Sequence, residues 1–227
     1  MSITGEVRCA IAAIALAIAM GHAGGQGIAA PAAALRDASE FDAIEDPVQR
    51  SKALFVEAGR VIQHPRCLNC HPTDAHPRQG EQLAMHQPPV VRGDDNHGAA
   101  AMRCGTCHQQ ENVDHARLPG HPAWHLAPIE MGWIGQSLNA ICQQLKDAER
   151  SGGMDLEALH EHMAHDSLVG WGWTPGPGRE PAPGTQGSFA KLVRAWIDSG
   201  AHCPDGAAGA ATGPEAPVGA DCSSCHV

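Results

Sequence analysis

The chain has 227 residues, of which 43% are hydrophobic, 18% are charged and only 4% are aromatic, and its formal net charge is -10. This composition is that of one globular domain or two small ones, and it excludes a polytopic membrane protein. The acidic charge argues against nucleic acid as a partner, because phosphate groups would be repelled. The 9 cysteines and 15 histidines, beside 5 Trp, 3 Phe and 0 Tyr, indicate a role for cysteine and histidine beyond packing.

The N-terminal segment, residues 1–34, has the features of a secretory signal peptide. Arg8 precedes an apolar run over residues 9–20, and small residues follow, with cleavage expected between positions 23 and 34. An apolar run of about 12 residues is too short to cross a bilayer, which needs roughly 20. We therefore expect a mature chain that is exported to the periplasm and has no integral membrane segment. An alanine-rich helix of the mature protein is the alternative.

The first predicted helix covers residues 47–63. Asp46 is placed as its N-cap and Pro47 at its first helical position. Its apolar residues, such as Phe55 and Ile62, follow helical spacing. The helix ends before Pro65, so it delivers the chain directly to a cysteine motif.

The pattern Cys-x-x-Cys-His occurs three times, at residues 67–71 (the first motif), 104–108 (the second motif) and 222–226 (the third motif). At this composition, chance would supply roughly 0.02 matches. Two thiols at this spacing can reach the two vinyl-derived carbons at one edge of a haem, and the following histidine can supply the proximal nitrogen of the iron. The thioether cysteines predicted in this way are Cys67, Cys70, Cys104, Cys107, Cys222 and Cys225. The predicted proximal ligands are His71, His108 and His226.

Two other readings of the motifs are a thioredoxin-like redox pair and a zinc site. A redox pair would need a βαβ context, which the sequence lacks, and zinc knuckles have no fixed histidine after the second cysteine. Haem c is therefore the expected cofactor. The third motif lies at the end of the sequence and is the weakest of the three, so we expect two haems, or three if it is loaded.

Loops and three further helices follow the first motif. Residues 71–102 are rich in proline, histidine, glutamine and glycine without a sustained period, and we expect them to form loop over the haem surface. Helices are expected at about 136–150, 155–165 and 188–199, the second of them capped by Asp155. The predicted fold class is mainly α with extensive loops: a small multihaem cytochrome c fold built around covalently attached haems, with no significant sheet.

Composition divides the mature chain into three parts. Residues 35–203 are predicted to form a di-haem cytochrome c domain. Residues 204–221 are rich in glycine, alanine and proline, which make up 13 of the 18 residues, and are expected to be a flexible linker. Residues 222–227 carry the third motif.

Two cysteines of the mature chain lie outside the motifs. Cys142 falls on the apolar face of its predicted helix, and Cys203 follows the last helix. In an exported chain, two leftover thiols are expected to form a disulfide bond.

The sixth ligand of each haem iron separates electron carriers from catalysts, because a second His or a Met closes the site. Among many candidates, His97 and His125 lie in segments expected to cover haem, and His160 lies on an otherwise apolar helical face. Met131 and Met163 are the methionine candidates.

Two neighbours of His160 have a different expected environment. His162 and His165 fall on the polar side of the same helix and are expected to be exposed. Alternatively, the three histidines together bind a transition metal.

Several stretches resemble a family of exported bacterial c-type cytochromes known as the isoquinoline 1-oxidoreductase subunit. They are VIQHPRCLNCHP, MRCGTCHQ, GHPAWHLAPIEMGW, HEHMAHDSLVGWGWTPGPGREPAPGTQ and AWIDSGAHCP. The resemblance covers roughly residues 41–204 and implies two haem motifs, matching the first and second motifs, and cysteines at the positions of Cys142 and Cys203. It also implies association with a molybdenum hydroxylase. The linker and the third motif depart from the family.

The expected function is electron transfer from a periplasmic dehydrogenase or hydroxylase to another cytochrome or an oxidase. The main alternative is a haem enzyme, such as a di-haem peroxidase or oxidase, with one open axial position. A haem-based sensor or a metal-binding protein is a third class. Because aromatic residues are scarce, we also expect the haems to complete the core, so that the haem-free chain lacks a sufficient core.

Overall fold

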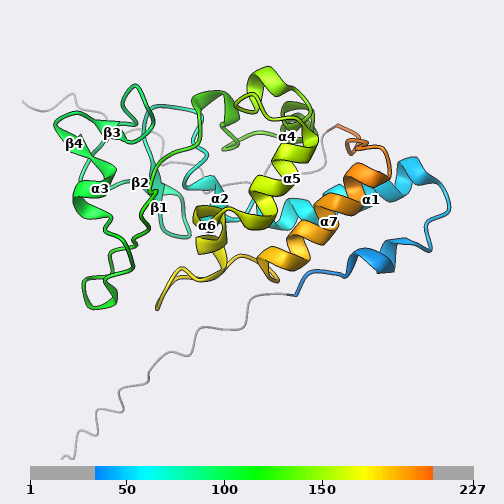
Figure 1. Cartoon of the computed structure of the whole chain (residues 1–227), viewed down its shortest axis with the longest axis horizontal. Helices are drawn as coiled ribbons and strands as arrows, with labels where there is room; N and C mark the ends of the chain where they lie inside the picture. The colour runs from blue at the N-terminus through cyan, green and yellow to red at the C-terminus, as the bar shows by residue number, and fades with distance from the viewer. Residues whose placement is uncertain (1–33, 207–227) are drawn as a thin grey trace, which may run out of the picture.

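The computed structural model describes residues 34–206. The expected signal peptide, most of the expected linker and the third motif, with Cys222, Cys225 and His226, lie outside the described residues. Within this range the fold is mainly α-helical, as predicted, with two small two-stranded sheets (Figure 1). None of its helices is long and apolar enough to cross a membrane.

Four helices of eight or more residues form what we call the helical part: α1 (Pro47–Ile62), α4 (Leu138–Leu145), α5 (Leu156–His165) and α7 (Gln186–Asp198). The predicted caps are confirmed. The Asp46 side chain accepts a hydrogen bond from the Val48 N–H at 2.9 Å, and the Asp155 side chain accepts one from the Ala158 N–H at 2.9 Å. These caps satisfy backbone donors that have no partner within the helix.

Short helical turns connect these elements. They are η1 (Ala38–Phe41), α2 (Pro65–Leu68), α3 (Cys104–Cys107), η2 (Asp114–Ala116), η3 (Ile129–Met131), η4 (Ala148–Arg150), α6 (Ser167–Gly170) and η5 (Trp171–Trp173). The first motif lies across α2, and the second motif begins at α3. The first and second motifs therefore each overlap a single helical turn.

Residues 69–130, which we call the hairpin part, contain two hairpins that the sequence did not predict. Strand β1 (Arg78–Gln79) pairs with β2 (Ala84–Met85), and β3 (Gly98–Ala99) pairs with β4 (Met102–Arg103). Strands of two residues are too short to show an alternation of polar and apolar side chains, so the sequence pattern does not predict them. In Figure 1 both hairpins and α3 lie at the end of the molecule away from α1 and α7.

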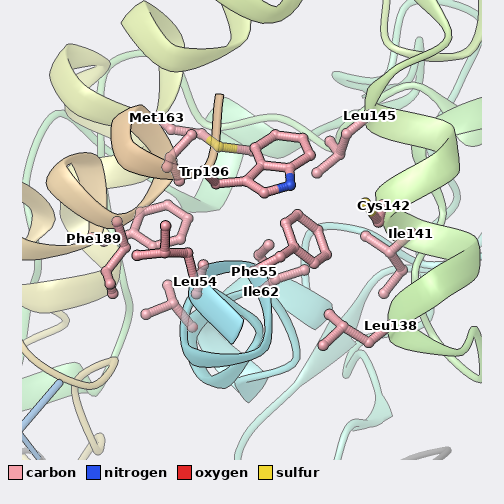
Figure 2. Packing of buried hydrophobic residues seen from close by; sticks show 14 of the residues in the cluster. Leu54, Phe55, Ile62, Leu138, Ile141, Cys142, Leu145, Met163, Phe189 and Trp196 are labelled. Carbon is pink, nitrogen blue, oxygen red and sulfur yellow. The ribbon is translucent and has the colours of Figure 1, made fainter. Parts of the chain in front are cut away.

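The helical part has its own hydrophobic core (Figure 2). Phe55 of α1 packs on Trp196 of α7, with ring centres 4.8 Å apart, and Ile141 and Leu159 join them from α4 and α5. The cluster comprises 20 buried residues, none of which comes from the hairpin part. This core speaks against the expectation that the haem-free chain lacks a sufficient core, as far as the helical part is concerned. For the hairpin part the expectation stays a prediction.

Cys142 and Cys203 form a disulfide bond, which is the pairing expected for the two leftover cysteines. It joins α4 to the segment after α7 and encloses a sequence separation of 61 residues. Closing a loop of this length lowers the conformational entropy of the unfolded chain, which raises the free energy of unfolding by about 4 kcal/mol.

We expect the double variant Cys142→Ala/Cys203→Ala to lose about 4 kcal/mol in free energy of unfolding, because its unfolded chain is no longer restricted. Denaturant titration measures this loss. Reduced wild-type protein is the control, and its free energy of unfolding should equal that of the variant. Equal stability of the variant and the oxidised wild type would contradict the prediction.

Candidate functional site

The first and second motifs each line a cavity of their own. The first cavity has a volume of about 280 Å³ and is lined by Cys67, Cys70 and His71 together with apolar side chains of α5 and α7. The second cavity has a volume of about 620 Å³ and is lined by Cys104, Cys107 and His108 together with residues of the β1–β2 hairpin. Ligand cavities in proteins are of this order, roughly 300–1,000 Å³.

The two cavities share a wall. Its residues line both cavities and are Arg66, Cys70, Trp124, His125 and Trp171. Within this wall the indole rings of Trp124 and Trp171 meet edge to face, with centres 4.9 Å apart. Groups bound in the two cavities would therefore be separated by a single layer of side chains.

The histidine of each motif is held in the same way. The Nδ1 atom of His71 lies 2.8 Å from the carbonyl oxygen of Met131, and the Nδ1 atom of His108 lies 2.8 Å from that of Pro119. A carbonyl oxygen only accepts hydrogen bonds, so Nδ1 carries the proton in both rings. The neutral imidazole then keeps its lone pair on Nε2, as in histidines that bind a metal.

A tryptophan lies flat against each of these histidines. The rings of His71 and Trp133 are 3.5 Å apart at an angle of 6°, and those of His108 and Trp124 are 4.4 Å apart at 13°. The Trp133 indole donates a buried hydrogen bond of 2.7 Å to Gln144 Oε1, which fixes its orientation. Both imidazoles are therefore held by one hydrogen bond and one stacked ring.

A tightly packed glycine follows each carbonyl acceptor. A Cβ at Gly132 would lie 2.8 Å from Thr73 Cα and 2.9 Å from Pro72 O, next to the first motif. A Cβ at Gly120 would overlap the carbonyl oxygen of Glu111. Glycine at these positions lets two backbone segments approach closely, which places the Met131 and Pro119 carbonyls beside the histidines.

We expect Gly132→Ala to destabilise the protein by about 1–3 kcal/mol, because the added methyl meets backbone atoms that cannot move without shifting the first motif. Thermal or denaturant unfolding measures the loss. Gly187→Ala is the matched control, since its new methyl in α7 would meet only Thr185 Oγ1 at 3.9 Å. If both variants were as stable as the wild type, the close approach at Gly132 would have no energetic role.

The cysteine thiols of the first and second motifs are not bonded to one another. Burial raises the pKa of the Cys67 thiol to about 12 and that of Cys70 to about 11, and it also raises the pKa of Cys104. Redox-active thiols of thioredoxin-like sites have lowered pKa values instead. The raised pKa values of the two thiols therefore disfavour the interpretation of the first motif as a thioredoxin-like redox pair.

Burial also affects the two motif histidines. It lowers the pKa of His71 to about 4, and it lowers the pKa of His108, which the adjacent His86 ring lowers further. Both rings are therefore neutral near pH 7, which is the protonation state that a metal ligand requires.

Positive charge is concentrated around the second cavity. Glu81 is the one acidic residue in its wall, whereas five arginines line it: Arg66, Arg78, Arg103, Arg117 and Arg179. Two of them are paired with carboxylates outside the wall, Arg78 with Asp74 and Arg103 with Asp95. Arg66 is buried and forms an ion pair with Glu81, yet its Nε atom has no hydrogen-bond partner among residues 34–206. The chain has a net charge of -10, yet arginines cluster around the second cavity. This cavity is therefore suited to an anionic ligand.

Only three of the five predicted candidates for a sixth ligand line a cavity. His125 lines both cavities, and Met131 and Met163 line the first. His97 and His160 line neither, although His97 stacks on His125 with ring centres 4.9 Å apart.

Two cavity histidines belong to the wider set of candidates but were not among the five favoured residues. His162 was expected to be exposed, but it is half-buried in the wall of the first cavity, with Nδ1 3.6 Å from Asp166 Oδ2. His86 lines the second cavity and lies in a segment without periodicity, so its position could not be predicted from the sequence. His165 is exposed, as predicted.

In the part of the chain that the structure covers, no three His, Cys, Asp or Glu side chains gather in a metal-binding arrangement, so His160, His162 and His165 do not form a three-histidine site there. Comparisons with protein-family models, with curated proteins and with solved structures gave no match to this chain.

Proposed function

We propose that this chain is a periplasmic c-type cytochrome that transfers electrons and carries one haem at each of the first and second motifs. One observation supports the proposal above all others. Two Cys-x-x-Cys-His motifs, 37 positions apart, line adjoining cavities that share a wall and hold their histidines by the same hydrogen bond and the same stacked ring. A single motif at the surface would not require this duplication.

The residues around the cavities fit haem. Haem has a flat apolar ring and two carboxylate side chains, and the first cavity is lined by apolar side chains such as Leu159, Met163 and Phe189. The unpartnered Nε of the buried Arg66, together with the arginines of the second cavity, provides hydrogen-bond donors for carboxylates. The motif cysteines are unpaired thiols, as thioether formation requires.

Bound haem would supply reversible one-electron chemistry at its iron, and the chain would control where and how readily this occurs. The Met131 and Pro119 carbonyls fix the imidazoles of His71 and His108 and increase their basicity. Apolar side chains such as Leu159, Met163 and Phe189 make up much of the wall of the first cavity and lower its polarity. The wall with Trp124 and Trp171 keeps the two sites close together, and a short separation favours electron exchange between them.

The remaining parts of the proposal extend beyond the described residues. The N-terminal segment would direct export to the periplasm, and the third motif at Cys222, Cys225 and His226 is a candidate site for a third haem on the linker. The donor would be a periplasmic dehydrogenase or molybdenum hydroxylase, and the acceptor another cytochrome or an oxidase. Because the chain is acidic, we expect a basic patch on the partner and an association rate that falls as salt increases.

Absorption spectroscopy of the purified ferric protein, followed by addition of peroxide, tests this function against the haem-enzyme alternative. An electron carrier should show low-spin haem, take up and release electrons reversibly, and turn over no peroxide. A high-spin haem with peroxide turnover would contradict the proposal and support a peroxidase.

A further inference from the structure

The second cavity contains a histidine that its motif does not account for. His86 follows strand β2, and its ring centre lies 5.9 Å from the ring centre of His108, with the ring planes at 66°. Both rings line the same cavity. His86 therefore belongs to the same site as the predicted proximal ligand, although 22 positions separate the two residues.

The separation of these rings matches two imidazoles that share one metal ion. A metal–imidazole bond is about 2 Å long, as in zinc sites, and each ring centre lies about 1 Å beyond its nitrogen, so two rings on opposite faces have centres about 6 Å apart. The observed 5.9 Å between His86 and His108 agrees with this value.

The tautomer of His86 is also suitable for a ligand. Its Nδ1 atom lies 2.9 Å from the carbonyl oxygen of Pro88, so Nδ1 carries the proton and Nε2 keeps a lone pair. His71 and His108 have the same arrangement. The His64 ring is the opposite case, because its Nδ1 accepts a hydrogen bond of 3.2 Å from the Arg66 N–H and its Nε2 then carries the proton in the neutral ring.

The β1–β2 hairpin holds His86 in place. Next to the hairpin turn, the Asn69 side chain of the first motif donates a hydrogen bond of 3.1 Å to the Gly80 carbonyl. The following residue, Glu81, pairs with the buried Arg66. These contacts hold the hairpin against the first motif, and the hairpin places His86 in the second cavity.

Resting on the proposed function, we propose that His86 is the sixth ligand of the haem at the second motif, on the face opposite His108. This haem then has two histidine ligands and no free position for peroxide or another small ligand. The second site is accordingly an electron-transfer site and not a catalytic one. The hairpin that supplies its ligand is anchored at the first site, so the two sites share a structural element as well as a wall.

The full-length haem-loaded protein with His86→Ala tests the assignment by absorption and electron paramagnetic resonance spectroscopy of the ferric state. We expect one haem per chain to change from low-spin to high-spin, and added imidazole to restore the low-spin form. His86→Met keeps a ligand at this position and is expected to raise the reduction potential of one haem. His97→Ala is the matched control, because the His97 Nδ1 also bonds a carbonyl oxygen while the residue lines neither cavity.

The outcomes separate this inference from the proposed function. If the wild type carries low-spin haem and His86→Ala leaves every haem low-spin with unchanged potentials, the assignment of His86 is wrong and the proposed function stands. If His97→Ala produces the high-spin haem instead, the assignment is again wrong. If the wild type carries no haem, both the assignment and the proposed function are wrong.

Discussion

Replacing Cys104 and Cys107 by serine is expected to yield a protein with one haem fewer than the wild type, and to reduce by one the number of electrons taken up per chain. Serine cannot form the two thioether bonds, so no covalent bond would hold haem at the second motif, and the cofactor would be lost before or during purification. The expected change is the complete loss of one covalent cofactor. Mass spectrometry of the denatured protein, together with reductive titration of the native protein, measures both effects.

The double variant Cys142→Ser/Cys203→Ser is the control for this experiment, because its cysteines form the disulfide and line neither cavity. It should keep every haem while losing stability. An unchanged cofactor mass in the Cys104/Cys107 variant would show that the second motif is not an attachment site.

The haem-free form of the wild type is expected to keep a folded helical part and to lose the structure of the hairpin part. The reason is the distribution of buried apolar surface: the 20-residue core lies between α1, α4, α5 and α7, and residues 69–130 contribute none of its buried members. Only short strands and turns organise the hairpin part, and sheets of two strands are marginal in water. In the haem-loaded form, the cofactors would supply the surface on which these residues pack.

Hydrogen exchange of the haem-free and haem-loaded proteins measures this difference residue by residue. Amides of α1 and α7 should exchange slowly in both forms. Amides of the two hairpins should exchange slowly only in the haem-loaded form. Slow exchange throughout residues 69–130 of the haem-free protein would contradict the prediction, as would loss of protection in α1 and α7.

The helices could be predicted where local rules and packing agree. In α1 and α5 a capping aspartate precedes a helix whose apolar residues face the core, and both caps are present in the structure. The helix expected at about 136–150 is shorter, because Asp147 accepts a hydrogen bond from the Glu149 N–H and starts a separate turn. Aspartate side chains compete for backbone donors in this way, and a search for apolar spacing alone does not detect it.

Only those residues of the site that are close together in the sequence could be predicted. Cysteines and the proximal histidine are fixed within five consecutive residues, so their spacing is visible in the sequence. The carbonyl that holds His71 comes from Met131, 60 positions away. The environment of His162 likewise depends on where α5 lies against the first cavity, so helical spacing alone wrongly predicted exposure. Contacts of this kind follow from tertiary packing, which no local pattern encodes.

Peptide mapping of the purified exported protein by mass spectrometry is the most direct test of haem attachment at the two motifs. We predict one haem on the peptide that contains Cys67 and Cys70, and one on the peptide that contains Cys104 and Cys107. Both peptides should carry the cofactor in the same molecule. Unmodified peptides from both motifs, in protein made by a host that attaches haem to c-type cytochromes, would contradict the account.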